Sequence, residues 1–142
     1  MREILFRGKC NEVGKYNGQW IEGFYGEDDG KPIIARSTDH GLIGYFCEPD
    51  SIGQYTGLTD KNGRKIFEGD IIHLEYSQVF FGGVYFGEYT AEVSYKEGCF
   101  ITDGINNGDE IETPLSGFDN DELEIIGNIH DNPELLGGES DG

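Results

Sequence analysis

The segment that most constrains the fold runs from Ile52 to Ile72 and reads IGQYTGLTDKNGRKIFEGDII. Short runs with apolar and aromatic residues flank the dipeptide Asn62-Gly63, which favours the positive φ angles of a two-residue hairpin turn. The sequence Glu68-Gly69-Asp70 then precedes a new apolar run, and its glycine permits a tight turn before a strand. The segment therefore predicts a compact β-protein.

The rest of the chain also has the pattern of strands. Between Glu88 and Tyr95, aromatic or aliphatic residues alternate with polar ones, as in a strand with one buried face. Glycine is abundant, with 23 residues, and aromatic strands separated by glycine turns are typical of all-β domains. A helical turn is expected only at Pro133–Leu136, where Asn132 can act as the N-cap and proline suits the first helical position.

These patterns predict an all-β (mainly β) fold with two parts. Residues 1–48 are expected to form a small β-meander that either stands alone or packs on the same core. Residues 49–137 are expected to form an SH3-like, barrel-like β core that ends in the short helical turn. Residues 138–142 contain no apolar side chain and are expected to form a disordered tail.

Charge is distributed very unevenly along the chain. The net charge is -18, yet residues 1–65 contain nine of the ten Lys and Arg residues. Lys96 is the single basic residue after position 65, against eighteen acidic ones. Because nucleic-acid binding requires cations near the phosphates, the second half is expected to repel nucleic acid and to attract basic surfaces.

The cysteines and the hydropathy indicate a cytoplasmic protein. Cys10, Cys47 and Cys99 are odd in number, and no pair has metal-ligand spacing. The sequence shows no signal-peptide pattern and no apolar run of membrane-spanning length. We therefore expect free thiols in a reducing cytoplasm and no contact with a membrane.

Three blocks of sequence, in order, resemble the YopX family of bacteriophage and prophage proteins. The blocks read REILFRGK (2–9) with NGQWIEG (17–23), GQYTGLTDKNG (53–63) with FEGDII (67–72), and EIIGNI (124–129) with NPELL (132–136). The resemblance covers most of the chain and implies a β-rich fold and a phage or prophage origin. The family carries no assigned biochemical activity, so the resemblance implies no catalytic residue.

Two groups of residues are candidates for binding. Six aromatic residues lie within fourteen positions, more than one face of a short hairpin can bury, which predicts either an interaction surface or a cross-strand aromatic core. They are Tyr76, Phe80, Phe81, Tyr85, Phe86 and Tyr89. The other group is a basic hairpin tip formed by Lys61, Arg64 and Lys65, which fits either a solvated turn or a contact with an acidic group.

No catalytic residue, metal site or cofactor is predicted, because the sequence contains no phosphate loop, dinucleotide fingerprint, zinc motif or nucleophile elbow. The leading hypothesis is a non-enzymatic phage protein that binds a host or phage protein with a basic surface. Self-association through the aromatic residues is compatible with this. The alternatives are a nucleic-acid-binding β-barrel that uses the basic tip and N-terminal cations, and an uncharacterised enzyme such as a hydrolase.

Overall fold

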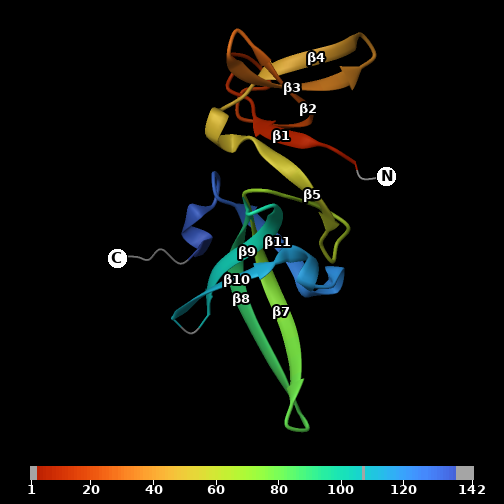
Figure 1. The fold of residues 1–142 in the computed structure, drawn as a ribbon. Coiled ribbons are helices and arrows are strands. Elements are labelled where there is room, and N and C mark those ends of the chain that lie inside the picture. Colours follow the sequence, from red (N-terminus) through yellow and green to blue (C-terminus); the bar gives the residue numbers. More distant parts are fainter. Residues whose placement is uncertain (1–2, 107, 137–142) are drawn as a thin grey trace. The chain divides into compact units, whose positions relative to one another are not determined.

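The computed structural model describes residues 3–106 and 108–136, with the side chains of Gln78, Phe80 and Asn106 outside that description. The expected all-β fold is confirmed: the strands form two antiparallel sheets, and the helical segments are short 3-10 turns (Figure 1). The chain divides into two compact units, Met1–Gly57 and Leu58–Gly142. The tail expected at 138–142 lies outside the described residues.

The first sheet has the strand order β4-β3-β2-β1-β5-β6. Its strands are β1 (Phe6–Lys9), β2 (Trp20–Asp28), β3 (Lys31–Thr38), β4 (Gly41–Phe46), β5 (Gly53–Thr59) and β6 (Lys65–Phe67). A 3-10 turn, η1 (Pro49–Ser51), precedes β5. The strand β5 continues from the first unit into the second, where β6 follows it in the chain.

The core of the first unit is small and contains two cysteines. Ile21 and Ile34 are fully buried there, together with Tyr45 and the thiols of Cys10 and Cys47. The two cysteines face each other in an isolated antiparallel bridge. Both are free thiols in the structure.

The division between the units falls inside β5, at Gly57, and not near residue 48, where the sequence suggested a boundary. The reason is strand pairing. The start of β5 pairs with β1, with Gln54 opposite Phe6, and the Tyr55 N–H donates to the Leu5 carbonyl at 2.8 Å. This pairing joins the residues after position 48 to the N-terminal sheet.

The second unit contains a five-stranded sheet in the order β10-β9-β8-β7-β11. Its strands are β7 (Asp70–Phe80), β8 (Gly83–Lys96), β9 (Cys99–Asn106), β10 (Asp109–Pro114) and β11 (Leu123–Asn128). Two 3-10 turns, η2 (Leu115–Gly117) and η3 (Asn120–Glu122), connect β10 to β11. Strand pairing among the described residues runs from β10 at one edge of this sheet to β11 at the other. This pairing does not join the two edges, so the expected SH3-like barrel stays a prediction.

Alternation along β7 and β8 produces the core of the second unit. Ile72, Leu74, Ala91 and Val93 are completely buried on the inner face of the sheet. The polar residues between them point to the outer face, as the alternating pattern around Ala91 predicted. The central hairpin of the unit therefore has one apolar face and one polar face.

The loop that contains Asn62-Gly63 differs from the prediction. A two-residue turn of this kind needs positive φ at both Asn62 and Gly63. Of these two residues only Gly63 has positive φ, at 78°, so the expected two-residue turn is wrong. Asp60 N–H donates to the Arg64 carbonyl, and Gly63 N–H donates to the Asp60 carbonyl, both at 2.9 Å. These bonds define a three-residue loop in which glycine occupies the left-handed position. The local cause is Asp60, whose carboxylate holds the loop from inside.

The C-terminal helical turn is confirmed as η4 (Pro133–Leu136). The strand before it contains an irregularity between Ile125 and Gly127 in the pairing of β11 with β7. The side-chain oxygen of Asn132 accepts a hydrogen bond from the Asn128 N–H at 3.2 Å. Asn132 thus links the end of β11 to the start of the helical turn.

Candidate interaction surface on the second unit

The strands β7 and β8 extend beyond their neighbours as a two-stranded hairpin, visible in Figure 1. β7 pairs with β11 only as far as Leu74, and β8 pairs with β9 only from Ala91 onward. Residues 75–88, here called the hairpin extension, therefore pair only with each other among the described residues. A two-residue turn with positive φ at Phe81 (52°) and Gly82 (78°) closes the extension.

The structure divides the six predicted aromatic residues into two groups. Tyr76 and Tyr89 lie at the base, on the inner face, with ring centroids 6.1 Å apart in a T-shaped arrangement. Phe81, Tyr85 and Phe86 lie toward the end of the extension, and the exposed fraction of the Phe86 side chain is 82%. Phe80 lies in β7, but its side chain is outside the described residues.

Aliphatic residues add to the exposed apolar end of the extension. Val79 and Val84 face each other across the two strands and are 72% and 56% exposed. Phe86 lies opposite Ser77, on the same face as this valine pair. An exposed apolar patch is typical of an interaction surface. The use of the extension for binding stays a prediction, since exposure alone does not test it.

The outer face of the five-stranded sheet is acidic next to this apolar patch. Pairing places Glu75 opposite Glu88, and it aligns Glu92, Asp103 and Glu112 across three strands. The pKa of Glu92 is raised, first because the side chain is partly buried and then because Asp103 and Glu68 lie near it. The sheet therefore concentrates carboxylates on one face.

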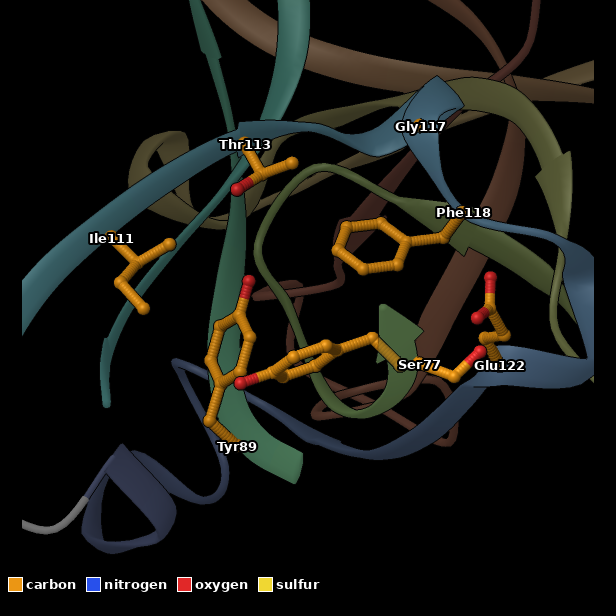
Figure 2. Close-up of a pocket in the computed structure, with 8 residues that line it drawn as sticks. Ser77, Tyr89, Ile111, Thr113, Gly117, Phe118 and Glu122 are labelled. Atoms are coloured by element: carbon orange, nitrogen blue, oxygen red, sulfur yellow. The ribbon is translucent and has the colours of Figure 1, made fainter. Parts of the chain in front are cut away.

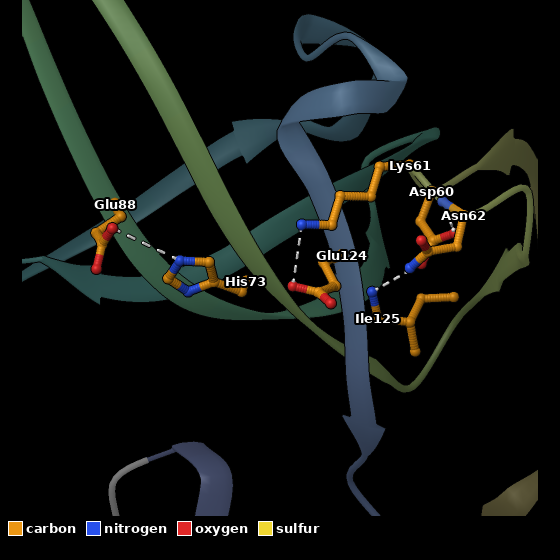
Figure 3. Close-up of polar contacts among 7 residues, drawn as sticks. All are labelled: Asp60, Lys61, Asn62, His73, Glu88, Glu124 and Ile125. Atoms are coloured by element: carbon orange, nitrogen blue, oxygen red, sulfur yellow. Dashed lines mark hydrogen bonds and ion pairs between the residues drawn. The ribbon is translucent and has the colours of Figure 1, made fainter.

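Two lysines pair with acids of this face. Lys96 Nζ lies 2.8 Å from Glu112, and Lys61 Nζ lies 3.4 Å from Glu124 (Figure 3). Lys61 belongs to the predicted basic tip, and Arg64 and Lys65 are exposed in the same loop or at its edge. The charge of Lys61 is thus directed toward an acid of its own unit, which weakens the tip as a phosphate site.

Three residues of types that bind metal ions form a cluster at the base of the extension. His73, Glu75 and Glu88 bring one ligand atom each to within 4.8 Å of one another, and His73 Nε2 lies 3.8 Å from Glu88 Oε2 (Figure 3). Imidazole and carboxylate ligands suit a divalent transition metal. The sequence alone does not group these residues, because only strand pairing brings Glu88 opposite Glu75.

A cavity of about 320 Å³ lies in the second unit on the inner side of the hairpin base (Figure 2). Aromatic rings and polar groups contribute to its walls: Tyr76, Ser77, Tyr89, Ile111, Thr113, Gly117, Phe118 and Glu122. Figure 2 shows the rings of Tyr89 and Phe118 on two sides of the space, with Glu122 beside Ser77. The sequence pattern indicates the two tyrosines as binding candidates but not Phe118 or Glu122, which enter the site from the connection between β10 and β11.

No helix of the described residues has the length and apolar character needed to cross a membrane.

Comparison with known proteins gives the family of the chain. No curated protein matches the chain significantly. The crystal structure of protein EF1440 from Enterococcus faecalis is similar in fold, with a TM-score of 0.54 and 23% identity over 96% of this chain and 99% of that one. The model of the family described as YopX protein matches residues 5–137, and the chain therefore belongs to the YopX family.

Proposed function

We propose that this chain is a non-enzymatic phage or prophage protein that acts in the bacterial cytoplasm by binding a protein with a basic surface. The binding surface is the outer face of the five-stranded sheet together with the hairpin extension. The observation that carries the proposal is the continuity of these two features. Glu75 and Glu88 lie on the same face as Phe86 and the valine pair Val79 and Val84, nearer the base of the extension.

The chemistry of this face suits a protein partner. Protein interfaces combine apolar and aromatic anchors with a polar rim. The exposed side chains of Val79, Phe81 and Phe86 supply the anchors, and the adjacent carboxylates supply the charge. Negative charge steers a basic partner toward the anchors and excludes acidic partners. The same charge opposes self-association, so a homodimer would form more readily at high salt.

Affinity capture with matched variants tests this function. The extension variant carries Val79→Thr, Phe81→Asn, Val84→Thr and Phe86→Ser. A control variant carries Val13→Ser and Leu42→Thr, which are exposed in the first unit. We expect the wild type and the control to retain a protein that has a basic isoelectric point. Salt should then elute this protein. The extension variant should lose this protein while its circular dichroism and melting temperature stay unchanged.

Two results would contradict the proposal. One is equal recovery by the extension variant, or recovery that salt does not reduce. The other is salt-dependent binding of duplex DNA in a fluorescence anisotropy titration, which would favour the nucleic-acid alternative. Sedimentation velocity at low and high salt measures self-association in the same samples.

A further inference from the structure

The cavity at the hairpin base has walls suited to a positively charged group. The rings of Tyr76, Tyr89 and Phe118 contribute three aromatic surfaces around about 320 Å³. Aromatic faces attract ammonium and guanidinium groups through the ring quadrupole, and the attraction grows when water is excluded. Ser77 and Thr113 add hydroxyl groups at the wall. A cation entering here would meet both aromatic surface and hydrogen-bond acceptors.

Glu122 brings a negative charge to the same wall. Its carboxylate accepts a hydrogen bond from the Asp119 N–H at 2.8 Å, as part of a capping box at the start of η3. This bond holds the side chain in place from the loop side. No lysine or arginine is among the described residues that line the cavity. A carboxylate at an aromatic wall favours a cation and disfavours an anion.

We propose that this cavity receives a lysine or arginine side chain from the protein partner. The rings of Tyr76, Tyr89 and Phe118 surround the cationic group, and the Glu122 carboxylate pairs with it. The volume is at the lower end of ligand cavities, as a single side chain requires. The inference rests on the proposed function, because it assigns a site for one residue of the basic partner.

The position of the cavity agrees with this role. Tyr76 and Tyr89 lie at the base of the hairpin extension, on its inner face, and exposed Tyr85 lies further along the same face. Val79, Val84 and Phe86 lie on the opposite face of the same two strands. A partner that encloses this two-stranded extension contacts both faces, and on the inner face it is within reach of the cavity. The apolar end would provide contact area, and the cavity would select for a positive charge.

An NMR titration of the isotope-labelled protein tests the cavity directly. The probes are the N-acetyl methyl esters of lysine and arginine, with the N-acetyl methyl ester of norleucine as the uncharged isostere of lysine. We expect saturable shifts at Tyr76, Ser77 and Phe118 with the cationic probes and at least about fivefold weaker binding of norleucine. Equal binding of norleucine would overturn the inference.

The variant Glu122→Gln isolates the role of charge. Glutamine at the third position of a capping box still accepts the backbone hydrogen bond, so the loop should keep its structure. We expect Glu122→Gln to weaken lysine binding at least about fivefold with an unchanged melting temperature. Glu110→Gln, exposed on β10 and outside the cavity wall, should bind as the wild type does. Unchanged lysine binding by Glu122→Gln would overturn the inference.

The two proposals can fail separately. If the cationic probes do not bind but capture of a basic protein still depends on the hairpin extension, the cavity inference alone is wrong. If the probes bind in a manner that depends on Glu122 but no salt-sensitive partner is recovered, the proposed protein-binding function is wrong and the cavity remains a cation site.

Discussion

The carboxylate of Asp60 accepts a hydrogen bond from the backbone N–H of Ile125 at 3.0 Å, although 65 positions separate the two residues (Figure 3). Its other oxygen accepts the N–H groups of Asn62 and Arg64 at 2.9 and 3.0 Å. The carboxylate is almost fully buried. One side chain therefore closes the loop after β5 and attaches it to β11.

Replacing Asp60 with Asn should destabilise the protein strongly. The asparagine amide keeps only one oxygen, so its NH₂ group would face a backbone N–H, which is also a donor. The hydrogen bonds lost in this way were made to a charged group, and such bonds are worth about 1.5–3 kcal/mol each. We expect a loss of about 2 kcal/mol or more in the free energy of unfolding, measured by urea denaturation. Asp121→Asn, exposed on η3, is the control and should change it by less than about 0.5 kcal/mol. Equal midpoints for the two variants would contradict this.

Asp60 should also make stability depend on pH in the acid range. Burial raises its pKa, but the N–H groups of Ile125, Arg64 and Asn62 and the charge of Arg64 outweigh it, so the pKa lies below its ordinary value of 3.8. A depressed pKa stabilises the folded state above the unfolded pKa, and this stability is lost as the pH falls through the folded pKa. The difference in unfolding free energy between wild type and Asp60→Asn should therefore be constant near neutral pH and shrink below about pH 4. A difference that grows on acidification would refute the assignment.

Gly63→Val should cost about 1 kcal/mol or more, because a β-branched residue at positive φ is strained. A Cβ atom at this position would meet no other atom within 4 Å, so the cost is backbone strain and not a clash. Gly63→Asn should cost less, since asparagine tolerates the left-handed region. Thermal unfolding of both variants measures the order, and a larger loss for Asn than for Val would exclude this cause.

Gly87→Ala should destabilise the hairpin extension through Tyr76. A Cβ atom on Gly87 would lie 2.4 Å from Cζ of the Tyr76 ring, so the ring must move away from its place beside Tyr89. Such overpacking costs about 1–3 kcal/mol. In a Tyr76→Ser background the same change should be neutral or stabilising, because glycine weakens a strand interior. An unchanged cost in that background would show that the ring is not responsible.

Cys10 and Cys47 should form a disulfide when the protein is treated with diamide. Hydrogen bonds from Asn11 N–H to the Phe46 carbonyl (3.0 Å) and from Glu48 N–H to the Lys9 carbonyl (2.9 Å) flank them. They are therefore a non-hydrogen-bonded antiparallel pair, with Cα atoms about 4.5 Å apart, within disulfide range.

Oxidation of this pair should be slow at neutral pH, because burial, followed by the neighbouring Cys10, raises the pKa of Cys47 to about 11. Intact mass spectrometry should show the loss of two hydrogen atoms, and proteolysis should identify a peptide joining the two cysteines. Cys99→Ser, which removes the exposed thiol, should still form the bond, and Cys47→Ser should not. A bond that instead includes Cys99 would contradict the pairing.

Local patterns in the sequence determined the class of fold. Alternation around Ala91 and Val93 predicted a strand with one buried face, since strand side chains point alternately to opposite faces. Glu97-Gly98 forms the turn between β8 and β9, with both residues at positive φ. Pro133 starts the short helical turn that its fixed φ favours. In each case the signal comes from neighbouring residues and needs no distant partner.

Contacts between distant segments decided the rest. Asn62-Gly63 reads as a two-residue turn, but the buried carboxylate of Asp60 and its bond to Ile125 produce a three-residue loop. The cluster of His73, Glu75 and Glu88 needs Glu88 opposite Glu75, and the cavity needs Phe118 and Glu122 beside the tyrosines of the hairpin base. Composition determined that this YopX protein is an acidic β-protein. Strand pairing and packing alone determined which charges and rings meet, because neither is set by the order of residues along one strand.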